Sequence, residues 1–315
     1  MSILIPVYNS EKYILQCIHS VFSQDYENIE YIIVNDATPD SSMKLINETL
    51  NVYPHRTQAI KIIEHETNQG IAATRNTLLK NATGNYVLFV DSDDFMEPGA
   101  IKSLVERAEL LDPDIIRFAY FTYMHGKKRL ISHPTYKNKE ELLKQYIGAW
   151  DSVQGLWQLF VKREVFTDNN ITFPKGINHC EDYLITAILF LKASSIVDLR
   201  EAYYNYRIDN ENSLTHQNKI KFRSDMISST TKLIEYLKNN GIYDNYKDQV
   251  LTRMFLCKQN YLLDQEFRDI KKFINIYPES NYYYRKFNYN IKERFLFFLA
   301  LHKQRDILEL LFKII

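Results

Sequence analysis

Short apolar runs alternate with amphipathic helical patterns from residue 2 to residue 91, and this alternation limits the folds open to the chain. The runs that predict strands are 2–9, 29–36, 60–63 and 86–90, and the patterns between them predict helices through 14–22, 43–50 and 71–80. Strands that alternate with helices are typical of a parallel sheet covered by helices on both faces. Because crossovers between parallel strands are right-handed, the carboxyl ends of these strands should meet at one edge of the sheet.

Three carboxylates follow the last of these strands, in the segment Asp91-Ser92-Asp93-Asp94. Asp91 and Asp93 are separated by one residue, so in an extended chain their side chains would point the same way. Two such carboxylates repel each other, and a divalent cation held together with substrate phosphates would relieve the repulsion. An acidic turn before the helix predicted near Pro98 explains the pattern equally well. From these residues alone, both interpretations stay open.

Polar groups from distant parts of the sequence should gather at the predicted sheet edge, as a nucleotide pocket requires. They are Pro6, Val7, Tyr8, Asp36, Gly70, Asp91 and Asp93. The chain has neither GxGxxG after its first strand nor GxxxxGK[ST]. These absences argue against a nicotinamide-dependent dehydrogenase and against a P-loop enzyme.

The amino-acid composition limits which binding partners and which cellular compartment fit the chain. The 39 basic and 39 acidic residues of this 315-residue chain balance, which argues against a nucleic-acid partner. Its three cysteines are odd in number and far apart, as in proteins of a reducing compartment. The N-terminal stretch lacks the basic region of a signal peptide, and no apolar run is long enough to span a membrane. We therefore expect a cytoplasmic protein.

A second acidic pair, Glu181-Asp182, precedes an apolar helical pattern over 184–191. Acids at a helix start are explained by the helix dipole alone. His179 and Cys180 stand beside the pair, but without further ligands at metal-site spacing they are better interpreted as loop residues. The neighbouring sequence alone therefore assigns no catalytic or metal-binding role to Glu181 and Asp182.

Taken together, these segments resemble a known family. The segments that carry the resemblance are Ile5-Pro-Val-Tyr-Asn9, Asn35-Asp36, Asn68-Gln-Gly70, Arg75-Asn76, Gly84 to Asp94 and Glu181-Asp182. In order and spacing, the chain resembles a bacterial family 2 glycosyltransferase of the cell-surface polysaccharide type. The resemblance is close to about residue 100, clear at 181–182 and weak after about residue 215. It implies a GT-A fold, an α/β Rossmann-like and mostly parallel sheet flanked by helices, in a catalytic domain at 1–216. A helical C-terminal region would then occupy 217–315.

The resemblance also implies a set of donor contacts. A UDP-sugar would lie along Pro6, Val7 and Tyr8, with its uracil bonded by Asp36. Asn68, Gly70 and Arg75 would close over the base and the diphosphate, and a guanidinium suits phosphate oxygens. A surface ion pair with a carboxylate is the other role open to Arg75. One departure concerns the second strand, where family members often have Asp-Asp-Gly-Ser and this chain has Asn35-Asp36-Ala37-Thr38.

The remaining implied contacts concern the metal and the diphosphate. Asp91, Ser92 and Asp93 would bind the donor, with Mn2+ or Mg2+ held by Asp91, Asp93 and His216. Arg207 would meet the diphosphate. Trp157 fits a sugar-stacking platform and a core position equally well.

The chemistry implied by the resemblance is an inverting transfer to a hydroxyl of a glycan or a lipid-linked acceptor. A sugar hydroxyl is a poor nucleophile, so a carboxylate must take its proton. By resemblance this base is Asp182, with Glu181 orienting it. Two alternatives stay open: a non-catalytic sugar-nucleotide-binding protein and a sugar nucleotidyltransferase. For the latter, the segment 8–12 poorly replaces the expected Gly-rich basic loop.

The C-terminal region from 217 onward shows repeated helical spacing. Its last part, 291–315, is strongly apolar with interspersed basic residues. Such a segment fits a helix buried in the protein, a face between two copies in a homodimer, or a helix lying in a membrane interface. In the last case the protein would contact the inner face of the cell membrane peripherally.

Overall fold

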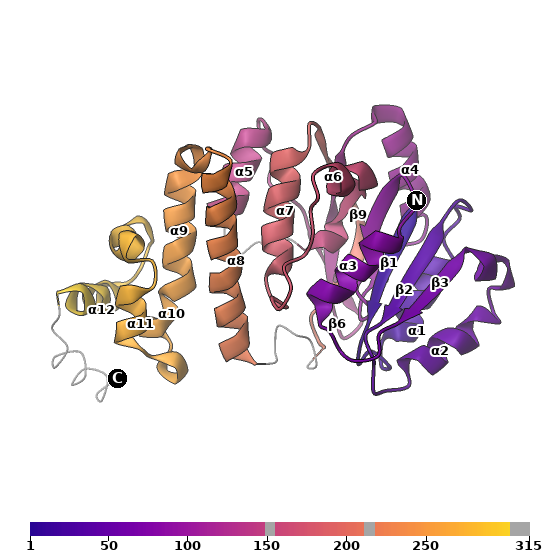
Figure 1. Cartoon of the computed structure of the whole chain (residues 1–315), viewed down its shortest axis with the longest axis horizontal. Coiled ribbons are helices and arrows are strands. Elements are labelled where there is room, and N and C mark those ends of the chain that lie inside the picture. The colour runs from indigo at the N-terminus through magenta and orange to yellow at the C-terminus, as the bar shows by residue number, and fades with distance from the viewer. Residues whose placement is uncertain (149–154, 211–217, 303–315) are drawn as a thin grey trace. The chain divides into compact units, whose positions relative to one another are not determined.

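The computed structural model of the protein describes residues 1–148, 155–210 and 218–302 (Figure 1). The chain divides into two compact units. One comprises Met1–Lys139 and Val153–Asp225, and the other comprises Glu140–Ser152 and Met226–Ile315.

Within its described residues, the first unit is built on one nine-stranded sheet. Its strands are β1 (Ser2–Val7), β2 (Glu30–Asn35), β3 (Ile60–Glu64), β4 (Tyr86–Phe89), β5 (Phe95–Met96), β6 (Ile115–Met124), β7 (Lys127–Ile131), β8 (Leu159–Lys162) and β9 (Ile196–Arg207). They lie in the order β3-β2-β1-β4-β8-β6-β9-β5, and β7 pairs with β6. The first four strands are parallel, whereas β8 runs antiparallel to β4 and to β6. The predicted parallel sheet is therefore confirmed for residues 2–89, and the sheet as a whole is mixed.

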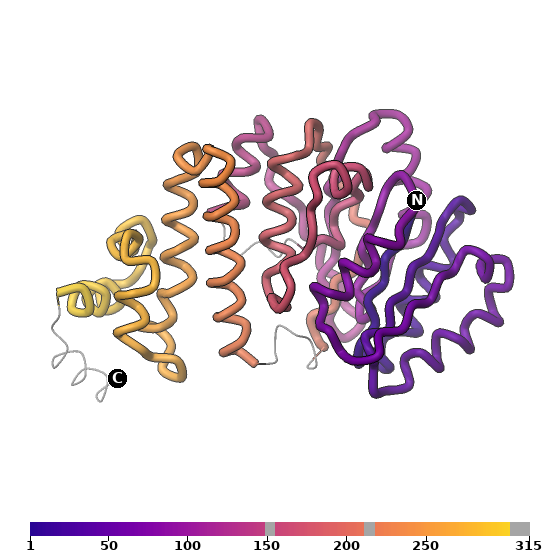
Figure 2. The backbone as a smooth tube through the Cα atoms, viewed as in Figure 1, coloured from indigo at the N-terminus to yellow at the C-terminus, as the bar shows by residue number. Residues whose placement is uncertain are grey.

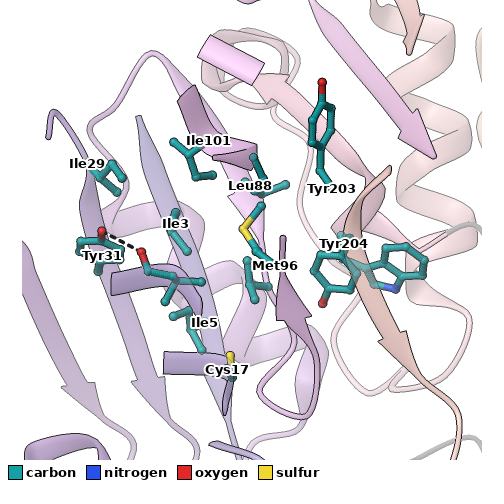
Figure 3. Packing of buried hydrophobic residues seen from close by; sticks show 14 of the residues in the cluster. Ile3, Ile5, Cys17, Ile29, Tyr31, Leu88, Met96, Ile101, Tyr203 and Tyr204 are labelled. Atoms are coloured by element: carbon teal, nitrogen blue, oxygen red, sulfur yellow. Dashed lines mark hydrogen bonds between the residues drawn. The ribbon is translucent and has the colours of Figure 1, made fainter. Parts of the chain in front are cut away.

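Helices of the first unit cover both faces of the parallel strands. They are α1 (Ile14–Phe22), α2 (Ser42–Leu50), α3 (Ile71–Asn81), α4 (Ala100–Leu111), α6 (Arg163–Asp168) and α7 (Glu181–Lys192), with short 3-10 turns η1 (Pro54–Ala59) and η2 (Leu156–Gln158). Ile3 and Ile5 of β1 share one apolar cluster with residues of α1 and α4 (Figure 3). Leu4 points to the opposite face because side chains alternate along a strand, and α3 contacts β1 there. Burial on both faces explains why β1 is apolar throughout.

The second unit is helical. Its elements are α5 (Lys139–Gly148), α8 (Lys219–Asn239), η3 (Tyr243–Tyr246), α9 (Lys247–Lys258), α10 (Asn260–Leu263), η4 (Gln265–Phe267), α11 (Ile270–Asn275), η5 (Pro278–Lys286) and α12 (Ile291–Leu301). Figure 2 traces their backbone, and by residue number α5 and α8 each begin in the first unit. Aromatic residues Phe255, Phe273 and Phe297 form the centre of its core. Across the described part of the chain, no helix combines the length and the apolar character needed to cross a bilayer.

Candidate functional site

The three carboxylates after β4 lie in a tight turn. The Asp94 N–H donates to the Asp91 carbonyl at 3.0 Å, so the segment is folded back on itself. The segment is therefore a turn and not the extended chain for which a shared direction of Asp91 and Asp93 was expected. Tyr204 of β9 holds the turn at two points: its hydroxyl accepts from the Asp91 N–H at 3.0 Å and donates to Asp94 Oδ2 at 2.9 Å.

Negative charge is crowded in this turn. Burial raises the pKa of Asp93, and the neighbouring charge of Asp91 raises it further. Burial and the charges of Asp93 and Asp91 hold the pKa of Asp94 well above its usual range. A divalent cation would relieve this repulsion, and an all-carboxylate set suits hard cations such as Mg2+ and Mn2+. The residues present therefore fit a metal held by Asp91 and Asp93.

The protein alone does not complete a metal site in the part of the chain that is described. No group of three or more His, Cys, Asp or Glu side chains there is arranged to hold an ion. His216, the third predicted ligand, lies outside the described residues. Two carboxylates with substrate phosphates and water are a common arrangement for Mg2+. The metal stays a prediction.

Arg207, at the end of β9, supports the acidic turn from within the protein. Its side chain donates through Nε to the Asp93 carbonyl at 2.9 Å, and its main-chain N–H donates to Asp94 Oδ1 at 2.7 Å. The guanidinium also lies over the rings of Tyr13 and Tyr123, at 4.6 and 4.8 Å from their centroids. These contacts shape the turn that would carry the metal. A contact of Arg207 with a diphosphate stays a prediction.

Arg75 of α3 joins the two acidic segments that the sequence separates. Its guanidinium pairs with Asp91 Oδ1 at 3.2 Å and also donates to Glu181. The rings of Phe89 and Phe173 lie against it, each with its centroid 5.8 Å away. Arg75 is only 5% exposed, which excludes the alternative of a surface position, although the carboxylate partner expected in that alternative is present.

The charge balance around Arg75 follows from its neighbours. Burial disfavours its charge, yet the charges of Asp91, Glu181 and Asp182 outweigh burial and raise the pKa of Arg75. A permanently charged guanidinium therefore stands between the acids after β4 and those at the start of α7. Nε of Arg75 is buried without a hydrogen-bond partner.

Glu181 and Asp182 begin α7 in different surroundings. The helix starts after Cys180, which has a left-handed φ of 58°. Glu181 is buried at 4% exposure, and burial raises its pKa although the charge of Arg75 opposes that shift. Asp182 is partly exposed, and its Oδ1 accepts from the Tyr183 N–H at 2.7 Å. The more accessible of the two acids is therefore the one that the resemblance makes the base.

Asp36, the acid predicted to bond the uracil, organises the loop before α3. Its Oδ1 accepts from His65 Nδ1 at 2.7 Å and from the Gln69 N–H at 2.9 Å. Its Oδ2 accepts from the Gly70 N–H at 2.9 Å, and Asp36 is 3% exposed. His65 Nε2 in turn lies 2.9 Å from the hydroxyl of Thr77. The sequence did not indicate His65 as part of this site, and a contact of Asp36 with a base stays a prediction.

The end of β1 lies beside the acidic turn. Pro6 and Val7 are buried within the strand, whereas Tyr8 just beyond it is 46% exposed. The Ser10 hydroxyl lies 2.5 Å from the hydroxyl of Ser92, which ties the loop after β1 to the turn after β4. The structure thus brings together the predicted donor residues of these two strands.

The loop before α3 also contacts the segment that carries the acids of α7. Gly70 has a φ of 85°, and a Cβ built there would fall 2.3 Å from the side chain of Asn178. The Asn178 N–H and His179 Nδ1 both lie near Asp225 Oδ2, at 3.1 and 3.0 Å. Asn68 is exposed in the same loop. His179 thus has a structural partner, in agreement with its interpretation as a loop residue.

Trp157 occupies a core position and is 3% exposed. Its ring stacks on those of Tyr204 and Tyr206, at centroid distances of 4.7 and 5.2 Å. It therefore supports the tyrosine that holds the acidic turn. A sugar-stacking role for Trp157 is not compatible with this burial.

Ala37 adopts a left-handed backbone conformation, with φ 54°, at the position where family members often have glycine. A Cβ is unfavourable there, so Ala37→Gly should raise the free energy of unfolding by roughly 0.5–1 kcal/mol. Ala73→Gly within α3 is the matched control and should lower it by about 1 kcal/mol. Urea unfolding of the three proteins measures both changes. A loss of stability in Ala37→Gly would show that this conformation is absent in solution.

Comparison with known proteins gives consistent matches. Residues 2–166 match the model of the family described as "Glycosyl transferase family 2". The uncharacterized glycosyltransferase EpsJ of Bacillus subtilis is 31% identical over 252 residues, which cover 78% of this chain and 70% of EpsJ. The poly(ribitol-phosphate) beta-N-acetylglucosaminyltransferase TarS of Staphylococcus aureus is 27% identical over 258 residues, which cover 79% of this chain but 42% of TarS.

Solved structures share the fold. The crystal structure of S. aureus TarS 1–349 in complex with UDP-GlcNAc matches with a TM-score of 0.70 at 21% identity, covering 89% of this chain and 80% of that one. The mannosyltransferase PcManGT of Pyrobaculum calidifontis, in complex with GDP-Man and Mn2+, matches with a TM-score of 0.53 at 14% identity. That match covers 96% of this chain and 86% of PcManGT. The predicted α/β GT-A fold with C-terminal helices is thereby confirmed.

Proposed function

The chain belongs to glycosyl transferase family 2 and is a nucleotide-sugar glycosyltransferase, and we propose that it uses a UDP-sugar in an inverting, metal-assisted transfer. The acceptor would be a hydroxyl of a glycan or a lipid-linked glycan. TarS, which shares the fold and was solved with UDP-GlcNAc, supports a uridine nucleotide as the donor. PcManGT, solved with Mn2+, supports a divalent cation.

The observation that carries the proposal is the placement of Arg75 between Asp91 and Glu181. This single side chain brings the metal-binding candidates of the β4 turn next to the acids of α7. A transferase that breaks a sugar–diphosphate bond needs both groups at one centre: one faces the departing diphosphate and the other faces the attacking hydroxyl. A binding protein that only holds the nucleotide has no need of the second group.

On the donor side, the strand ends provide the nucleotide site. Tyr8 presents an exposed ring beside buried Pro6 and Val7, and the ring of a base can stack against it. Asp91 and Asp93 would hold Mn2+ or Mg2+ against the diphosphate. The cation, when bound, would supply positive charge against the negative charge that grows on the leaving UDP.

On the acceptor side, Asp182 takes the proton of the attacking hydroxyl. The acceptor oxygen forms its bond to C1 of the sugar from the face opposite the diphosphate, while the bond from C1 to the diphosphate oxygen breaks. The proton ends on Asp182, and the electron pair of the broken bond leaves with UDP. Glu181, buried and paired with Arg75, keeps the first turn of α7 in place. The single displacement inverts the configuration at C1.

Donor hydrolysis tests the proposal. Purified protein is incubated with a panel of UDP-, GDP- and dTDP-sugars, with Mn2+ or with EDTA, and nucleotide release is followed. We expect slow release from one UDP-sugar, which EDTA abolishes. Nucleotide binding is measured in parallel by calorimetry, because release can require the acceptor. Absence of UDP binding with and without metal would overturn the proposal.

Asp93→Ala tests the metal ligand separately. We expect the gain in UDP affinity on adding Mn2+ to fall by roughly 10- to 100-fold, because a ligand of the cation is lost. UDP affinity measured in EDTA should stay at the wild-type value and serves as the internal control. The fold should persist, since the substitution removes a carboxylate whose pKa is raised by burial and by Asp91. Unchanged metal dependence of UDP binding would contradict the role of Asp93.

A further inference from the structure

One face of α12 in the second unit carries bulky apolar side chains that the described residues leave exposed. Ile291, Phe295 and Phe298 are 88%, 49% and 44% exposed. Their spacing of four and three residues places them in one stripe along the helix, and His302, stacked on Phe298 at 4.0 Å, continues it. We call these four residues the α12 stripe.

The opposite face of α12 already has its partners. Leu296, Phe297, Leu299 and Ala300 are buried in the core of the second unit, where the Phe297 ring packs on that of Phe255 at 5.3 Å. Backbone N–H groups at the start of the helix also have partners. Asn290 and Glu293 form a capping box, in which each side chain accepts from the main-chain N–H of the other. The apolar residues of the stripe therefore take no part in the core of the second unit, and their exposure is unfavourable unless something else covers them.

The charges beside the stripe are positive. At the helical period, exposed Lys292 lies on one side of it and exposed Arg294 lies on the other. Glu293, the acid of this helix, points away from the stripe into the capping box. The guanidinium of Arg294 donates to the main-chain carbonyls of Tyr289 and Phe287, so its charge is held in place.

We propose that the α12 stripe is a docking surface for a membrane that contains anionic lipids. An apolar stripe with a basic residue on each side is the pattern of a helix that lies in the interface, with its rings among the acyl chains and its bases at the headgroups. A second copy of the chain fits less well, because its stripe would present the same two bases and no free acid of α12, since Glu293 is held in the capping box.

Vesicle flotation of the full-length protein tests the docking surface. The vesicles are phosphatidylcholine alone or an equimolar mixture with phosphatidylglycerol, and no nucleotide is present. We expect the wild-type protein to float with the mixed vesicles and much less with phosphatidylcholine alone. Phe295→Ser/Phe298→Ser should weaken that binding roughly tenfold or more, because apolar area no longer enters the bilayer. Lys292→Glu should weaken it at low salt.

The control removes two comparably exposed apolar side chains elsewhere. Val52 and Leu110 are 63% and 73% exposed, and Val52→Ser/Leu110→Ser should bind vesicles as the wild type does. Thermal unfolding followed by circular dichroism establishes that each variant is folded. Equal binding to both vesicle types, or full binding by Phe295→Ser/Phe298→Ser, would overturn the proposal. The proposal would also be overturned if the wild-type protein formed a dimer that did not bind vesicles and if Phe295→Ser/Phe298→Ser dissociated that dimer. Because no donor is used, failure here leaves the proposed transferase function untouched.

Discussion

Asp182→Asn is expected to lower the rate of sugar transfer by about 10²- to 10⁴-fold, the range typical of general acid–base catalysis. An amide has nearly the shape of the carboxylate but does not accept the proton of the acceptor hydroxyl. The side chain can still accept the Tyr183 N–H that Asp182 Oδ1 accepts at 2.7 Å, so the start of α7 should persist. The measurement is the transfer rate to a lipid-linked or soluble glycan acceptor, together with UDP affinity, which should not change.

The control for this substitution is Asp168→Asn, which removes an exposed carboxylate at the end of α6. It should transfer sugar at the wild-type rate. Glu181→Gln tests the two acids of α7 separately, because Glu181 is buried and paired with Arg75 whereas Asp182 is partly exposed. It should retain more activity than Asp182→Asn. Transfer by Asp182→Asn near the wild-type rate would show that another group is the base.

The parallel half of the sheet could be predicted because its signals are local. The strands β1, β2 and β4 are buried on both faces, so their sequences are continuous apolar runs, and each is bounded by turn residues. The antiparallel insertion of β8 between β4 and β6 could not be predicted in the same way. It depends on pairing between residues such as Val87 and Val161, which are distant in sequence.

The acidic turn shows why the site was only partly predictable. The carboxylates are visible in the sequence, but their directions are set by a hydroxyl from Tyr204, which is more than a hundred residues away. Asp94 looked like one more acid of the cluster, whereas its carboxylate accepts from Tyr204 and from the Arg207 N–H. Trp157 was ambiguous for the same reason, since only the structure places its ring against Tyr204.

His65 and Asn178 were missed because neither belongs to a recognisable pattern. His65 directly follows β3, and a polar residue at the carboxyl end of a parallel strand was the one signal available for it. Asn178 precedes the acids of α7, and its side chain packs against Gly70 where any Cβ would clash. The positive φ of Gly70 that goes with this contact was not visible in the sequence. Both residues support the predicted loop and acids from positions that tertiary packing alone determines.

Arg75→Met is expected to lower the free energy of unfolding by about 3–5 kcal/mol near neutral pH, the range for breaking a buried ion pair. The substitution leaves Glu181 buried at 4% exposure without its cation. Burial already raises the pKa of Glu181, and loss of the opposing charge of Arg75 should raise it further. A carboxyl with a raised pKa in the folded state binds more protons there than in the unfolded chain. The contribution of Glu181 to the stability of the variant should therefore be fully present below the unfolded value of 4.5 and be lost as pH rises above it.

Denaturant unfolding at about pH 5 and about pH 8 measures this effect, and the gap between wild type and Arg75→Met should widen at the higher pH. Adding Glu181→Gln to Arg75→Met removes the uncompensated charge, so the double variant should recover much of the lost stability and lose most of the pH dependence. Arg75→Lys keeps a positive charge, but its single ammonium group lacks the two separate nitrogens with which the guanidinium pairs with Asp91 and Glu181. The loss of stability in this variant should therefore be intermediate. A stability loss that is equal at both pH values and unaffected by Glu181→Gln would mean that Arg75 acts through its packing on Phe89 and Phe173 instead of through the ion pair.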